Sequence, residues 1–236
     1  MKWYLFTALA VLGTFNAHAF DFTLSQSEFN TWDDRCKKAY SITQVGRSSG
    51  YYSPLNKEQA ANARKFGEEA GGAWHYCAGL ILIQRGSSTT GKARDENLNR
   101  AVNEIRFTYN KIRAEHAWYP EIHIDYARIL YLTGKKSDAF TVLNRLIESH
   151  SSNSLPYTAL AYYLKRENKL QQAIETLQNA PEVLLNESAE LNYFLGWYLM
   201  EANQLEQAES YAKRAYELNY PMPALRQRLA AKGHNW

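Results

Sequence analysis

From residue 120 onward, small and apolar residues recur along the chain at a nearly constant interval. Three small residues stand 34 and then 35 positions apart: Ala127, Ala161 and Gly196. Three alanines follow them at the same offsets: Ala139, Ala173 and Ala208. Each interval holds two amphipathic helical patterns around a short polar turn, and such a period is typical of stacked helix hairpins. The sequence therefore predicts an all-α fold.

The small residues indicate how each hairpin closes. Two helices approach closely where the facing side chains are reduced to a methyl group or a hydrogen. One small residue on each helix, twelve positions apart across the turn, allows this approach. Because a single hairpin cannot bury its whole apolar face, three or more hairpins must stack.

This pattern resembles the tetratricopeptide repeat. In the first unit, 120–153, the family's marked positions hold Tyr126, Ala127, Leu130, Ala139, Leu143 and Leu146, the last in place of the usual Ala. In the second unit, 154–188, they hold Leu160, Ala161, Leu164, Ala173, Leu177 and Ala180. In the third unit, 189–222, they hold Leu195, Gly196, Leu199, Ala208, Ala212 and Ala215. The resemblance implies a right-handed α-solenoid in which the first helices of the units line a concave groove.

The array is flanked by further helical segments. Residues 20–119 are predicted to form an N-terminal helical region, with helices at about 26–40, 55–84 and 93–115 and a kink at the Gly71-Gly72 pair. The pattern from Trp74 to Ala78 has the spacing of a first repeat helix, so this region includes a candidate degenerate hairpin with a turn about eleven residues too long. Residues 223–236 are predicted to form a capping helix and tail.

The first nineteen residues have the features of an export signal. A positive start at Lys2 precedes an apolar stretch, and Ala17-His18-Ala19 matches a cleavage site. Cleavage after Ala19 predicts a periplasmic or secreted protein, soluble once the signal is removed. No later segment is apolar for long enough to span a membrane.

The charge balance gives no reason to expect a nucleic-acid partner. The chain has 27 basic and 24 acidic residues, a formal net charge of +3 at neutral pH. Nucleic-acid binding is usually accompanied by a clear basic excess on one face.

The two cysteines, Cys36 and Cys77, are predicted to form a disulfide, because an exported chain folds under oxidising conditions. The closed loop of about 40 residues would stabilise the fold by roughly 4 kcal/mol in the chain-entropy model. Two alternatives remain, namely free thiols or a metal site with His75, although a structural zinc site needs four ligands and no fourth is evident.

No segment predicts a catalytic, cofactor or metal site, so the chain is not expected to be an enzyme. Gly86 to Lys92 matches a phosphate-binding loop, but Ala93 stands where such loops have a magnesium-binding hydroxyl. We interpret this segment as a polar insertion between helices. His116 and His123, with nearby carboxylates, are interpreted as surface charge.

The resemblance places a candidate partner-binding set on the groove, and it combines aromatic side chains with cations: Arg128, Tyr131, Tyr162, Lys165, Arg166, Tyr193 and Trp197. Aromatic residues and arginine carry much of the energy of protein interfaces. A peptide bearing carboxylates would suit this surface. The alternative is that several of these aromatic residues pack between the units as core.

These patterns favour a non-catalytic binding scaffold of the cell envelope that holds a protein or peptide. One alternative is a structural subunit of a larger envelope assembly or a homo-oligomer. Another is an accessory factor or enzyme acting on cell-wall or exported polysaccharide, because aromatic residues also stack on sugar rings.

Overall fold

A computed structural model describes residues 22–236, and the predicted export signal lies outside this part of the chain. Within it the chain forms fourteen helices and no strand, which confirms the all-α prediction. None of these helices is both long and apolar enough to cross a lipid bilayer.

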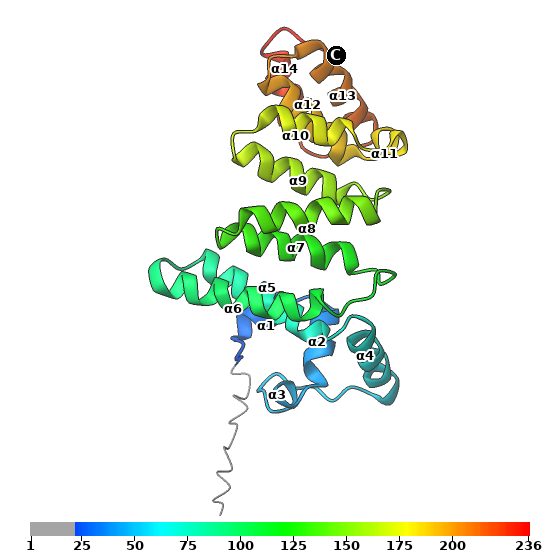
Figure 1. The fold of residues 1–236 in the computed structure, drawn as a ribbon. Coiled ribbons are helices and arrows are strands. Elements are labelled where there is room, and N and C mark those ends of the chain that lie inside the picture. Colours follow the sequence, from blue (N-terminus) through cyan, green and yellow to red (C-terminus); the bar gives the residue numbers. More distant parts are fainter. Residues whose placement is uncertain (1–21) are drawn as a thin grey trace, which may run out of the picture.

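Three helix hairpins with a tetratricopeptide-like arrangement form the second half of the chain. They consist of α7 (Tyr119–Leu132) with α8 (Lys136–Ser149), α9 (Leu155–Arg166) with α10 (Leu170–Gln178), and α12 (Ala189–Glu201) with α13 (Leu205–Glu217). The hairpins stack one upon another along a single axis (Figure 1). Each tight turn contains one residue with positive φ: Gly134, Asn168 and Asn203. Glycine and asparagine are the residues that adopt this left-handed conformation most readily.

The recurring small residues lie where the sequence predicted. All six are buried: Ala127, Ala139, Ala161, Ala173, Gly196 and Ala208. A Cβ atom on Gly196 would lie 3.1 Å from the carbonyl oxygen of Ala208, a contact that leaves little room even for a methyl group. The close approach of paired helices therefore depends on these positions.

Two shorter helices complete the array. α11 (Glu182–Glu187) is inserted between the second and third hairpins. α14 (Ala224–Ala230) packs on α12 and α13 and buries Leu225 and Leu229 completely. It covers the end of the stack, at the position predicted for a capping helix.

The N-terminal region divides into more helices than predicted: α1 (Gln26–Thr31), α2 (Asp34–Ser41), α3 (Gln44–Arg47), α4 (Lys57–Glu69), α5 (Ala73–Ser87) and α6 (Gly91–Tyr109). The helix predicted at 26–40 breaks before Asp33, whose carboxylate caps α2 by accepting from the Arg35 N–H. The helix predicted at 55–84 breaks at Gly71 and Gly72, which both have positive φ. A chain reversal of this kind ends a helix rather than kinking it.

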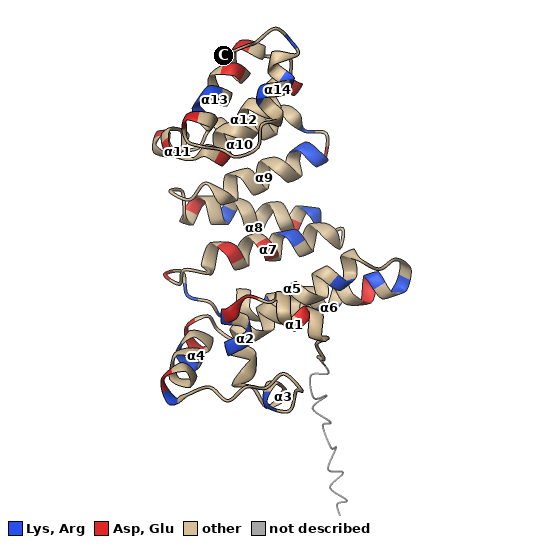
Figure 2. Ribbon diagram, turned by 180° about the vertical axis from the view of Figure 1, so that it is seen from behind, with Lys and Arg blue, Asp and Glu red and all other residues tan. Residues whose placement is uncertain are grey.

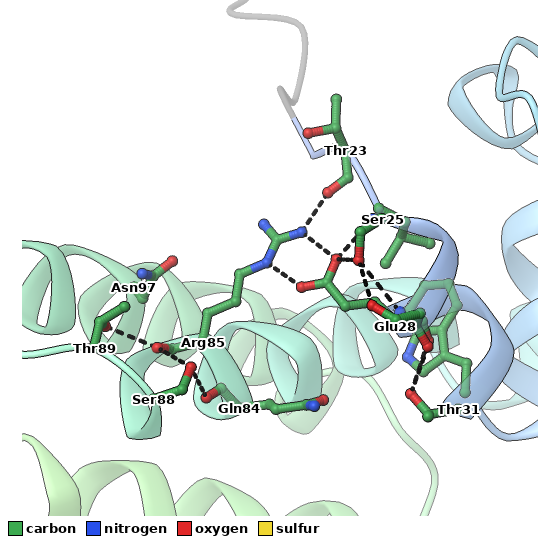
Figure 3. Close-up of polar contacts among 12 residues, drawn as sticks. Thr23, Ser25, Glu28, Thr31, Gln84, Arg85, Ser88, Thr89 and Asn97 are labelled. Carbon is green, nitrogen blue, oxygen red and sulfur yellow. Dashed lines mark hydrogen bonds and ion pairs between the residues drawn. The ribbon is translucent and has the colours of Figure 1, made fainter.

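The predicted polar insertion at Gly86–Lys92 is mostly helix, which corrects that interpretation. α5 continues to Ser87 and α6 begins at Gly91, so the extra residues of this hairpin lengthen its two helices. Gly86 lies inside α5, where a Cβ would fall 2.5 Å from the Leu98 side chain of α6. After α5 ends, the Thr89 hydroxyl donates to the carbonyl oxygen of Arg85 at 2.8 Å (Figure 3). No open phosphate-binding loop is formed here.

The disulfide between Cys36 and Cys77 is present and confirms the predicted pairing. It joins α2 to α5, with the two Cα atoms 5.6 Å apart and both residues buried. The Trp32 indole covers it and donates to the Cys77 carbonyl oxygen at 3.1 Å. The alternatives of free thiols or a metal site are thereby excluded for these two residues.

α7 joins the N-terminal region to the array. Its Ile122 and Ile129 side chains pack into the N-terminal core, whereas Ala127 and Leu130 pack into the core of the stacked hairpins. Because α7 contributes to both, the two cores form one continuous stack of helices.

Basic and acidic residues are interspersed along the outside of the whole stack (Figure 2).

Candidate binding face

The first helices of the three hairpins, α7, α9 and α12, form a surface that we call the first-helix face. α9 contacts both α7 and α12. A hollow of about 340 Å³, the α9 hollow, opens on this face, and residues of all three helices line it: Glu121, Ile124, Asp125, Leu155, Thr158, Ala159, Tyr162, Tyr163, Glu190 and Phe194. On α9 these residues recur with the helical period, so they belong to one side of that helix.

The α9 hollow exposes large apolar side chains. Leu155 is 45% exposed and Tyr162 is 44% exposed. Ile124 and Phe194 are half-buried beside them. Contiguous apolar surface in a hollow, rimmed by polar groups, is typical of an interaction site.

Three carboxylates line the hollow: Glu121, Asp125 and Glu190. The Tyr76 hydroxyl of α5 donates to Asp125 Oδ2 at 2.7 Å and lies 3.3 Å from Glu121 Oε1. Burial and the adjacent carboxylates raise the pKa of Tyr76, so its hydroxyl remains a proton donor. Tyr76 thus fixes the orientation of Asp125 from the N-terminal region.

Burial weakens the preference of two of these carboxylates for the charged form. It raises the pKa of Asp125, and the hydrogen bond from Tyr76 and the charge of Arg128 only partly oppose this effect. Burial also raises the pKa of Glu190. Arg128 Nη1 lies 3.8 Å from Asp125 Oδ1, which is longer than a charge-assisted hydrogen bond.

A second hollow of about 480 Å³ extends the face toward the N-terminal region. It is lined by α5, together with Arg128 of α7: Leu80, Ile83, Gln84, Ser87, Ser88 and Arg128. Arg128 contacts Asp125 of the α9 hollow, so the two hollows are neighbours.

Five of the predicted partner-binding residues remain accessible: Arg128, Tyr162 and Arg166 are exposed, and Lys165 and Trp197 are half-buried. Tyr162 lines the α9 hollow, and Arg128 is exposed next to it. Trp197 is half-buried on α12, where its indole donates to Glu201 at 2.8 Å and the Arg228 guanidinium lies 4.7 Å from its ring centre. Whether these residues contact a partner stays a prediction.

Two of the four predicted aromatic residues, Tyr131 and Tyr193, are buried and do not lie open on the face. Tyr131 is only 8% exposed, because its ring packs against Tyr163 at 4.4 Å. Its hydroxyl donates to Glu167 at 2.6 Å. Tyr193 is 5% exposed and stacks on Tyr220 at 4.2 Å. For these two residues the alternative interpretation, packing between units, is correct.

The predicted cations already contact polar groups of the protein itself. Lys165 Nζ lies 3.0 Å from Glu201 Oε1, and Arg166 donates to the Tyr162 hydroxyl at 3.1 Å. Arg128 faces Asp125. The first-helix face is therefore not the cationic surface that the sequence led us to expect.

Part of the hollow lies one helical turn closer to the start of each first helix than predicted. Several lining residues each precede a predicted partner-binding residue by three positions, among them Asp125, Ala159, Glu190 and Phe194, whereas Tyr162 is itself a predicted residue. Two of the later positions are covered by side chains of adjacent segments, since Tyr163 packs on Tyr131 and Tyr220 packs on Tyr193, whereas Arg128, Tyr162 and Arg166 remain exposed. The helical period identifies the correct side of each helix, but it carries no information on which turn remains uncovered.

Within residues 22–236, no three His, Cys, Asp or Glu side chains are grouped so that they could hold one metal ion. The three carboxylates of the α9 hollow therefore act as separate anionic groups. His123, which the sequence placed on the surface, is buried between tyrosine rings, and burial lowers its pKa to about 4.

Comparisons with known proteins give a likeness of fold at most. No family model and no curated protein matches the chain. One solved structure, the crystal structure of MamA protein, is similar over 66% of this chain and 83% of that chain, with 17% identical residues and a TM-score of 0.44. At these values the likeness says nothing about a partner or an activity.

Proposed function

We propose that this chain is a non-catalytic binding scaffold of the cell envelope, and that it holds a protein or peptide partner on the first-helix face. The observation that carries the proposal is the α9 hollow, where large apolar side chains of α9 stay exposed between α7 and α12. A binding surface built on packed helices is held rigid, which lowers the entropic cost of association.

The location in the envelope is supported by two independent features. Residues 1–19 have the composition of an export signal. The mature part contains one buried disulfide and no free cysteine among residues 22–236. Structural disulfides form and persist mainly in oxidising compartments such as the periplasm or the extracellular space.

The test is crosslinking from a single position of the face in living cells. A photoreactive phenylalanine analogue replaces Tyr162, which is exposed in the α9 hollow, and in a control it replaces Gln172, which is exposed on α10. We expect a discrete adduct from position 162 that is absent from position 172. It should also disappear when Leu155→Glu is added, because a charge in the apolar hollow opposes docking. Equal labelling from both positions, or none from position 162, contradicts the proposal.

The mass of the adduct separates the proposed function from its alternatives. An adduct of twice the chain mass indicates a homo-oligomer or structural subunit that uses this face for assembly. A foreign polypeptide indicates a scaffold. The polysaccharide alternative requires measurable heat when soluble cell-wall glycan fragments are titrated into the protein, with loss of that heat in Tyr162→Ala.

A further inference from the structure

The chemistry of the α9 hollow indicates what kind of partner it accepts. Its apolar lining includes Leu155 and Ala159 of α9 and Phe194 of α12. Its volume of about 340 Å³ lies at the lower end of the range for small-ligand pockets, which is about 300 to 1,000 Å³. A hollow of this volume accepts one or two apolar side chains rather than a folded surface.

Every side chain that lines the hollow and carries a formal charge is a carboxylate. Glu121 and Asp125 stand on α7, and Glu190 stands on α12 at the opposite side of α9. The Tyr76 hydroxyl satisfies a hydrogen-bonding position on Asp125, but a neutral hydroxyl leaves the negative charge in place.

Cations of the protein compensate these carboxylates incompletely. Arg128 is half-exposed and lies 3.8 Å from Asp125. The Glu190 side chain makes no ion pair and no hydrogen bond with any residue between 22 and 236. A half-buried carboxylate without a cation is an unfavourable arrangement that an oppositely charged ligand group relieves.

The other cations of the same face already contact polar groups of the protein. Lys165 pairs with Glu201, and Arg166 donates to the hydroxyl of Tyr162. A carboxylate-bearing peptide would therefore meet three carboxylates, whereas Arg128, Lys165 and Arg166, the cations described on this face, already contact polar groups of the protein. Charge complementarity favours the opposite kind of partner.

We propose that the α9 hollow binds a peptide segment in which an apolar side chain is next to a lysine or arginine. This inference rests on the proposed function, since it names the partner chemistry of the same face. The apolar side chain packs on Leu155 and Phe194, and the cation extends to Glu190. Lysine and arginine have the length to reach this carboxylate while their methylene groups cover apolar surface.

A peptide selection tests the chemistry without knowledge of the natural partner. A phage library of random linear peptides is panned on the disulfide-bonded mature protein and, in parallel, on Leu155→Glu. We expect the enriched sequences to combine an apolar residue with an adjacent lysine or arginine, and we expect the apolar residue of this motif to be lost on Leu155→Glu, which replaces apolar surface with a further carboxylate. Enrichment of acidic motifs, or of no motif, overturns the inference.

Affinity of one selected peptide then locates the cation. Glu190→Gln should weaken binding about tenfold, whereas the matched control Glu175→Gln, an exposed glutamate of α10, should leave it unchanged. Replacing the peptide's cation with norleucine should weaken binding to the wild type and have little further effect on Glu190→Gln. Equal loss in both protein variants, or none in either, contradicts the assignment.

The outcomes keep this inference separate from the function on which it rests. If position 162 crosslinks to a partner in cells but no basic, apolar peptide is selected, the face is a binding site and the chemistry assigned here is wrong. If light scattering shows a dimer that Leu155→Glu converts to a monomer, the hollow is occupied by a second copy of the chain. That result overturns the peptide proposal.

Discussion

Arg85 of α5 and Glu28 of α1 form a two-point ion pair, with Nε 2.6 Å from Oε1 and Nη2 2.7 Å from Oε2 (Figure 3). Glu28 also accepts from the backbone N–H of Ser25, so one carboxylate caps α1 and fixes it to α5. Bidentate pairs of this geometry are among the stronger polar contacts in proteins. The start of the described chain is therefore tied to the longer helices behind it.

The Arg85–Glu28 pair predicts an acid-dependent loss of stability. Hydrogen bonds from Arg85 lower the pKa of Glu28 to about 2 in the folded protein, below its ordinary value of 4.5. A carboxyl whose pKa is lower when folded stabilises the fold above about pH 4.5, and this contribution is lost as pH falls toward 2. Because the pair is partly solvated, we expect it to contribute about 2 kcal/mol at neutral pH.

Denaturation in urea between pH 7 and pH 2.5 checks this expectation. The free energy of unfolding of Glu28→Gln should be lower at neutral pH and should converge with the wild type at the acid end. Asp34→Asn, which alters an exposed carboxylate of α2, serves as the control and should follow the wild-type profile. Parallel curves for the wild type and Glu28→Gln would show that the pair does not contribute.

The disulfide predicts a difference between the oxidised and reduced protein. Because Cys36 and Cys77 close a loop with a sequence separation of 41, the chain-entropy model assigns roughly 4 kcal/mol to the bond. The double variant Cys36→Ala with Cys77→Ala should lose about 2 to 4 kcal/mol in urea denaturation. Reductant should destabilise the wild type and leave the double variant unaffected. Equal sensitivity of both proteins to reductant would be inconsistent with this bond.

The hydrogen bond from Tyr76 to Asp125 predicts a link between the N-terminal region and the binding face. Among the described residues, Tyr76 is the only one whose hydroxyl donates to Asp125, a mostly buried carboxylate. Tyr76→Phe removes this donor, and the loss should lower the stability of the fold by about 1 to 3 kcal/mol. The pKa of Asp125, already raised by burial, should rise further, because the opposing hydrogen bond is gone.

Two measurements separate this role from simple loss of packing. Carbon NMR of the carboxyl groups reports the titration of Asp125 in both proteins. Tyr211→Phe is a matched control, since the Tyr211 hydroxyl makes no hydrogen bond within residues 22–236. A stability loss in Tyr76→Phe without a change in the titration of Asp125 would mean that the hydroxyl does not act on the carboxylate.

The sequence by itself determined the hairpins and the disulfide. Ala127 and Ala139, twelve residues apart, predict a close helix pair because the geometry depends on the size of the two side chains and on one short turn. The break at Gly71-Gly72 was visible as a weak point, although the sequence pattern indicated a kink and not the end of a helix. Such features are local, so a single chain carries them.

Only the tertiary structure decided which side chains the partner-binding face exposes. Tyr131 and Tyr162 stand on successive first helices, yet the first is buried by Tyr163 and the second remains open to solvent. Similarly, Glu190 became a site residue because α9 and α12 leave a hollow beside it. Exposure is set by neighbours supplied from distant segments, whereas helical periodicity encodes only the side of the helix on which a residue lies.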